Sequence, residues 1–181
     1  TPALVNDTLY VAAQRYHPAT GVLTAFDARH GNPRWPQPVV IHAEQAGNNA
    51  GFSAGPFVHA GLIYVGNQNH RLYALDAANG QVRWTAEVAH GIATTPAFIQ
   101  GLIVFGANDG LIHACDAASG KPAWTYPLGG HVLTDPLVWE DTLFVATDDG
   151  VVAALPWHLG RYADAAAHLE KQGQLAAAGD A

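Results

Sequence analysis

A pattern that recurs at a fixed spacing constrains the fold of this chain more than any other feature. Gly61–Trp84 reads GLIYVGNQNHRLYALDAANGQVRW, and Gly101–Trp124 reads GLIVFGANDGLIHACDAASGKPAW. Each copy contains two short apolar runs, a turn, and a third run that ends in tryptophan. A period of about 40 residues with several strands per period is typical of a β-propeller, in which each repeat forms one blade.

Four such units can be aligned on a proline that follows a small or polar residue. These prolines are Pro2, Pro56, Pro96 and Pro136. The last two steps between them are equal, whereas the first step is longer. We assign the excess to a hairpin loop at Arg15–Gly21 and to the long segment Pro36–Ala54, because repeat folds tolerate insertions in loops.

Each unit is expected to form a blade of four strands. In the second unit the second and third strands are predicted at Leu62–Gly66 and Leu72–Leu75. The fourth strands are predicted to end at Trp35, Trp84 and Trp124. The apolar first and second strands suit positions that neighbouring blades bury on both faces.

The fourth unit departs from the pattern, so the last blade is predicted to be incomplete. Asp164 occupies its tryptophan position, and strong helix formers follow. The predicted organisation is therefore a propeller domain over residues 1–158 and a helical segment over 159–181. The units are 1–54, 55–94, 95–134 and 135–158. The helical segment either caps an exposed blade edge or begins a helical-repeat region.

Composition excludes several classes of partner and site. The formal net charge is −7 with only eight Lys and Arg, which argues against nucleic-acid binding. No apolar run approaches the roughly 18 residues of a membrane span. A single cysteine, Cys115, leaves no internal disulfide framework and fits cytoplasm or periplasm equally. Because Thr1-Pro2 opens inside a repeat, we expect the chain to be a piece of a longer protein.

The segments Leu72–Trp84 and Leu111–Trp124 resemble the pyrroloquinoline-quinone-type propeller repeat, whose core reads L-Y-A-L-D-A-x-T-G-x-x-x-W. The resemblance covers about residues 1–160 and implies blades of four antiparallel strands. It also implies tryptophan docking, in which each fourth-strand indole packs against the next blade. The residues that carry over have structural roles: Trp35, Trp84, Trp124, the turn glycines Gly31, Gly80 and Gly120, and the turn acids Asp27, Asp76 and Asp116.

The same resemblance favours a non-enzymatic function. Enzymes of this family hold their quinone with a disulfide between adjacent cysteines, a stacking tryptophan and calcium, and this chain has no Cys-Cys pair. We therefore expect no cofactor and an interaction scaffold or sensor that binds proteins. Non-enzymatic propellers of this kind include outer-membrane assembly scaffold lipoproteins, sensor domains of membrane kinases, and parts of bacterial multidomain signalling or conflict systems. A propeller that binds a small ligand or metal is the alternative, followed by a fragment of a quinone-dependent dehydrogenase.

Four blades are few for a ring of this repeat type. Three arrangements would resolve the shortfall: a fragment of a longer propeller, a homodimer that completes an eight-bladed ring, or a small ring that closes alone. An open half-ring would expose apolar blade faces at both ends.

Two regions are candidate functional sites. The connections between blades contain His42, His90 and His131, and Asp135 lies at the expected channel entrance. Converging histidines would bind a metal or an anion, although the chain has no HxH or HExxH spacing to support one. The Arg15–Gly21 loop and the segment Pro36–Ala54 are the better candidates for a partner-binding surface, since loops present the variable chemistry of a repeat fold.

Overall fold

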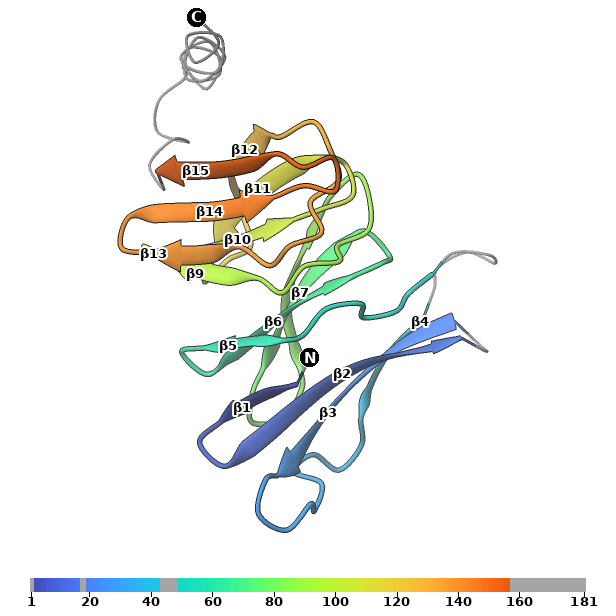
Figure 1. The fold of residues 1–181 in the computed structure, drawn as a ribbon. Coiled ribbons are helices and arrows are strands. Elements are labelled where there is room, and N and C mark those ends of the chain that lie inside the picture. Colours follow the sequence, from blue (N-terminus) through green and yellow to red (C-terminus); the bar gives the residue numbers. More distant parts are fainter. Residues whose placement is uncertain (1, 17–18, 43–48, 157–181) are drawn as a thin grey trace, which may run out of the picture.

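The computed structural model describes residues 2–16, 19–42 and 49–156. These residues form four antiparallel sheets, three of four strands and one of three strands. The sheets lie side by side in a curved row, with the first and fourth blades at opposite ends (Figure 1). The all-β propeller architecture is thus confirmed, whereas the predicted helical segment 159–181 and the position of a fourth strand in blade 4 lie outside the described residues.

Each blade follows the chain order from its inner to its outer strand. Blade 1 consists of β1 (Ala3–Val5), β2 (Thr8–Tyr16), β3 (Ala19–Asp27) and β4 (Val39–His42). Blade 2 consists of β5 (Phe57–His59), β6 (Leu62–Asn67), β7 (Arg71–Asp76) and β8 (Val82–Glu87). Blade 3 consists of β9 (Ala97–Ile99), β10 (Leu102–Gly106), β11 (Leu111–Asp116) and β12 (Pro122–Pro127). Blade 4 consists of β13 (Leu137–Trp139), β14 (Thr142–Ala146) and β15 (Val152–Pro156).

The core lies between the blades. Three clusters of buried side chains fill the three spaces of the row, one between each pair of neighbouring sheets. Because successive strand residues point to opposite faces, odd-numbered Ile63 and Val65 of β6 pack toward blade 1, and Tyr64 packs toward blade 3. All three are at most 1% exposed. A blade in the middle of the row is therefore apolar on both faces, as the continuous apolar runs predict.

Tryptophans of the repeat pack over turn glycines of the next blade. The indole of Trp35 is 2% exposed, and its Nε1 donates a hydrogen bond to the carbonyl of Ala77 at 3.2 Å. Its ring lies against Gly80 of blade 2, and the ring of Trp84 lies against Gly120 of blade 3 in the same way. The Nε1 atoms of Trp84 and Trp124 are buried and have no hydrogen-bond partner among the described residues. Trp35 and Trp84 thus pack on a turn glycine in the same way, whereas only the indole of Trp35 among the described tryptophans of the repeat donates a hydrogen bond.

The turn acids stabilise the hairpins between third and fourth strands. Asp76 accepts a hydrogen bond from the backbone N–H of Ala78 at 2.9 Å and pairs with Arg83 at 2.5 Å. The hydrogen bond from the Arg83 guanidinium lowers the pKa of Asp76 most, and the backbone N–H of Ala78 lowers it further. The hydroxyl and backbone N–H of Ser119 lower the pKa of Asp116 in the same direction.

We expect these carboxylates to make folding pH-dependent. Because their pKa values are lower in the folded protein than in the unfolded chain, their stabilisation is present above the unfolded pKa near 3.8 and is lost as pH falls through the folded pKa. The urea midpoint should therefore fall as the pH drops below about 4. Asp116→Asn should lower the urea midpoint at neutral pH, and its midpoint should fall less on acidification than that of the wild type. An equal fall in the midpoints of the wild type and Asp116→Asn would contradict this role of the carboxylate.

Two predictions of strand boundaries were wrong. The predicted Arg15–Gly21 loop is mostly strand, because β2 and β3 pair from Thr8↔Asp27 as far as Tyr16↔Ala19. The fourth strands do not end at tryptophan: β8 continues from Trp84 to Glu87, which pairs with Arg71 of β7. β8 is longer than predicted because its backbone pairing with β7 continues past Trp84.

Trp35 lies before β4 rather than at its end. The intervening segment reads Pro36-Gln37-Pro38, and proline lacks the N–H that a ladder needs. Pairing therefore resumes only at Val39, opposite Leu23. No helix in the described part of the chain is long and apolar enough to cross a membrane.

Candidate functional site

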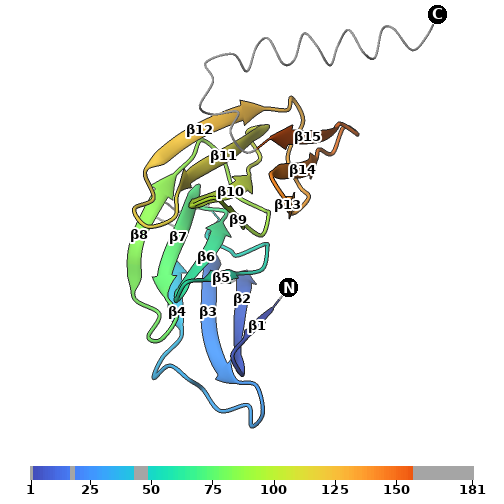
Figure 2. The ribbon, with the colours of Figure 1, turned by 90° about the vertical axis from the view of Figure 1, so that its left-hand side faces the viewer.

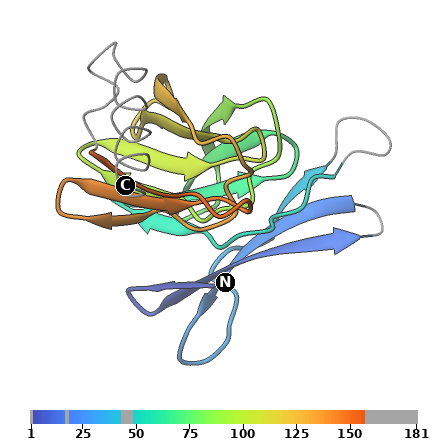
Figure 3. The same cartoon turned by 45° about the horizontal axis from the view of Figure 1, so that its top comes forward.

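The first blade extends beyond its neighbours at one end of its hairpin. β2 and β3 have nine residues each, whereas β6 and β7 have six. Their hairpin projects past the other blades, toward the side where β4 ends (Figure 3). At its end Arg15 is exposed and the ring of Tyr16 is 73% exposed. The extension thus presents a cation and an aromatic ring to solvent.

The base of this extension is held by the connection to blade 2. Gln14 Nε2 donates to Asn49 Oδ1 at 3.1 Å, and Asn67 Nδ2 donates to the carbonyl of Ala50 at 2.8 Å. Gly21 sits so close to this connection that an added Cβ would lie 2.5 Å from the Ala50 carbonyl oxygen. These contacts fix the β2–β3 hairpin in place where it leaves the blade.

The four channel-face candidates differ in their contacts. His42 is the exposed last residue of β4, and the ring of His90 lies 6.1 Å from that of His70. His131 directs Nδ1 at the carbonyl of Asn108, 2.5 Å away. Asp135 accepts a hydrogen bond from the backbone N–H of Thr95 at 2.7 Å. Among the described residues, no group of three His, Cys, Asp or Glu side chains is placed to hold a metal ion.

Sequence reasoning missed a histidine–aspartate pair in blade 3. His113 Nε2 lies 3.0 Å from Asp109 Oδ2, and its ring stacks on Phe105 with centroids 5.3 Å apart. One repeat earlier, Asn69 Nδ2 donates to the hydroxyl of Tyr73 at 2.7 Å. The signal in the sequence was the spacing of four residues that both pairs share. Both pairs hold a hairpin turn against the strand that follows it.

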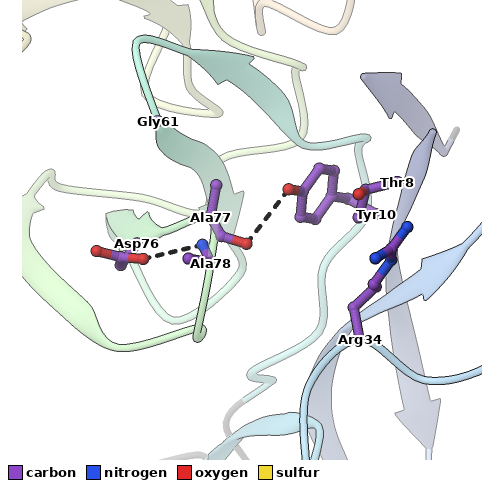
Figure 4. A pocket seen from close by; sticks show the side chains of 7 residues that line it. All are labelled: Thr8, Tyr10, Arg34, Gly61, Asp76, Ala77 and Ala78. Atoms are coloured by element: carbon purple, nitrogen blue, oxygen red, sulfur yellow. Dashed lines mark hydrogen bonds between the residues drawn. The ribbon is translucent and has the colours of Figure 1, made fainter. Parts of the chain in front are cut away.

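A pocket of about 620 Å³ lies between blades 1 and 2 (Figure 4). Its polar groups are engaged in structural contacts: the Tyr10 hydroxyl donates to the Ala77 carbonyl at 3.2 Å, and Arg34 pairs with Asp27 at 2.5 Å. Burial raises the pKa of Tyr10, which keeps the hydroxyl protonated as a donor. The lining residues are Thr8, Tyr10, Arg34, Gly61, Asp76, Ala77 and Ala78.

The only cysteine of the chain has no features of a reactive thiol. Cys115 is 3% exposed in the cluster between blades 2 and 3. Burial, with a smaller contribution from Asp116, raises its pKa to about 12. Since the thiolate is the nucleophile, this thiol acts as a packing group at neutral pH.

Apolar side chains are exposed at the end of the row formed by blade 4. Trp139 is 67% exposed, Leu137 63%, Phe144 38% and Val152 78%. The residue one repeat before Val152 is Ile112, which is fully buried against blade 4. The face that interior blades bury is therefore left uncovered on blade 4 by the described residues.

Comparison with known proteins assigns the chain to a family. The sequence profile of the family described as outer membrane protein assembly factor BamB matches residues 19–112 and 93–180. The chain belongs to the BamB family. The BamB of Escherichia coli K12 is 30% identical over 99 residues, which cover 52% of this chain and 23% of that protein.

Solved structures show the same fold. The crystal structure of BamB from Moraxella catarrhalis has a TM-score of 0.64 at 23% identity, covering 86% of this chain and 44% of that one. Quinohemoprotein alcohol dehydrogenase from Comamonas testosteroni has a TM-score of 0.65 at 20% identity, covering 88% of this chain and 33% of that one. The chain thus spans less than half the length of these structures, and propellers of both kinds share its fold.

Proposed function

We propose that this chain is a non-enzymatic scaffold that binds proteins during assembly of outer-membrane proteins. The observation that supports this most is the BamB family match, which extends over most of the sequence. The structural likeness to a dehydrogenase concerns the fold alone, because one propeller fold supports many unrelated functions. A single buried cysteine also leaves the chain without the adjacent-cysteine pair of the quinone enzymes.

The projecting β2–β3 hairpin is the proposed partner-binding surface. Tyrosine and arginine are enriched among the residues that dominate binding energy, and both Arg15 and Tyr16 are exposed at its end. The extension is held rigidly at its base, which lowers the entropy lost on binding. No other described blade carries a hairpin of this length between its second and third strands.

A gene deletion in the natural host tests the proposed function. We expect loss of the full-length protein to reduce the amount of folded outer-membrane proteins, measured by heat-modifiable mobility on gels. Reintroduced protein should restore it, whereas Arg15→Ala/Tyr16→Ala should restore it less. The matched control is Val82→Ala, an exposed residue of an outer strand. Unchanged outer-membrane proteins in the deletion strain would contradict the proposal.

Calorimetry tests the enzymatic alternative. Titration of the chain with pyrroloquinoline quinone in the presence of Ca²⁺ should give no binding heat, since the adjacent cysteines that hold the quinone in the enzymes have no counterpart here. Saturable binding with about one site per chain would favour the dehydrogenase interpretation instead.

A further inference from the structure

Two histidines lie next to each other at one end of blade 2. His70 belongs to the turn between β6 and β7, and His90 follows β8 in the connection to blade 3. Their ring centroids are 6.1 Å apart, the ring planes are inclined by 31°, and both residues are exposed. Blade 2 has a neighbouring blade on each side, so the pair lies away from both ends of the row (Figure 2).

Backbone hydrogen bonds hold the two histidines together. The N–H of Val88, two residues before His90, donates to the carbonyl of His70 at 2.9 Å. Two residues after His90, the N–H of Ile92 donates to the carbonyl of Asn67, the last residue of β6, at 3.2 Å. The two segments are thus joined on either side of the pair, which lowers the entropy lost when a ligand orders the site.

Blade 3 has glycine at both of these positions. One repeat later, Gly110 corresponds to His70 and Gly130 corresponds to His90. The two glycines also adjoin, because a Cβ added to Gly110 would lie 3.3 Å from the carbonyl oxygen of Gly130. The fold therefore brings these two positions together in both blades, and blade 2 places an imidazole at each of them.

The backbone conformation of His70 is one that favours glycine. Its φ is +69°, and Gly110 and Gly150 at the equivalent turns have φ of +78° and +93°. The other described non-glycine residues with positive φ all lie in turns between first and second strands. A side chain in this conformation costs stability, and strain of this kind is concentrated at functional sites. Blade 2 thus retains a histidine where glycine would relieve the strain.

We propose that His70 and His90 together bind a divalent transition-metal ion. Imidazole nitrogen is a favoured ligand of Zn²⁺, Ni²⁺ and Cu²⁺. With metal–nitrogen bonds of about 2.0–2.1 Å, two imidazoles on one ion have centroids about 4.5–6.5 Å apart, depending on the angle at the metal. The observed 6.1 Å lies in this range. No third His, Cys, Asp or Glu joins the pair among the described residues, so solvent completes the coordination.

The surrounding charge favours a cation over an anion as the ligand. Arg71 follows His70 in the chain, and its guanidinium Nη2 lies 2.8 Å from Glu87 Oε1. The positive charge of Arg71 is therefore balanced by a carboxylate of the neighbouring strand. The whole chain has a formal net charge of −7, which raises the local concentration of cations and lowers that of anions.

Calorimetric titration of the full-length protein with Zn²⁺ tests this proposal, which goes beyond the proposed function and does not depend on it. We expect His70→Gly and His90→Gly each to weaken binding at this site by more than about tenfold, since even the loss of an outer-shell partner costs about 10–100-fold in metal affinity. His42→Ala, at the exposed histidine that ends β4, should leave the affinity unchanged.

The His70→Gly variant keeps the test independent of folding. Blade 3 has glycine at the same position, and glycine adopts the φ of His70 without steric cost. Without metal, its urea midpoint should be no lower than that of the wild type. With Zn²⁺, the midpoint should rise for the wild type and stay unchanged for His70→Gly, because a ligand that binds the folded state stabilises it.

Equal Zn²⁺ affinities of the wild type and His70→Gly would overturn the proposal. So would a loss of affinity in His42→Ala as large as that in His70→Gly. Neither result would alter the outer-membrane phenotype of the gene deletion, so the two proposals fail separately.

Discussion

Gly120→Ala is expected to lower the free energy of unfolding by about 2–5 kcal/mol. Gly120 has φ of +71°, which costs about 1–2 kcal/mol for a residue with a Cβ. The added Cβ would also collide with the six-membered ring of Trp84, which packs over this glycine. Overpacking of that kind costs about 1–3 kcal/mol. Urea denaturation followed by circular dichroism measures the change.

Gly31→Ala is the matched control, because Gly31 has the same backbone conformation without the collision. Its φ is +73°, and no described atom lies within 4 Å of the added Cβ. We therefore expect a loss of only about 1–2 kcal/mol. In a Trp84→Ala background the cost of Gly120→Ala should fall to that of Gly31→Ala. A cost that is unaffected by Trp84→Ala would show that the indole does not pack on this turn.

Trp35→Ala is expected to cost about 3–5 kcal/mol, the second large effect. The indole is 2% exposed in the cluster between blades 1 and 2, so its removal leaves a cavity. It also ends the hydrogen bond from Nε1 to the carbonyl of Ala77. Because this cluster joins blade 1 to the rest of the row, we expect hydrogen exchange in β2 and β3 to rise more than in β10 and β11.

Trp35→Phe separates the two contributions. It retains an aromatic ring and loses the N–H, so we expect a smaller cost, with about 1 kcal/mol from the hydrogen bond. Val82→Ala, at an exposed outer-strand position, should change stability by no more than about 0.5 kcal/mol. A Trp35→Ala protein as stable as Val82→Ala would contradict the docking role of this indole.

Periodicity was sufficient to predict the architecture. The repeat step between Trp84 and Trp124 places equivalent residues of blades 2 and 3 at equivalent burial, because each blade meets the same neighbours. The turn glycine Gly80 has φ of +75°, the conformation that its turn requires. In blades 2 and 3 the same sequence repeat therefore predicts where the strands lie, where the turns lie and which side chains are buried.

Blade 1 was predicted less well, because its deviations are decided by tertiary contacts. Residues around Tyr16 and Ala19 have no strong strand pattern, yet they pair because β4 joins at Thr20–Leu23 and the connection at Ala50 supports them. The pairing of His113 with Asp109 was missed because the spacing that it shares with Asn69 and Tyr73 does not by itself show that the two side chains are in contact.

The amount of folded outer-membrane proteins in the natural host tests the central claim, that this chain belongs to a protein-binding scaffold, most directly. Deletion of the gene should lower that amount, and the full-length protein with Arg15→Ala/Tyr16→Ala should restore it less than the protein with Val82→Ala. A deletion strain whose outer-membrane proteins are unchanged would contradict the account.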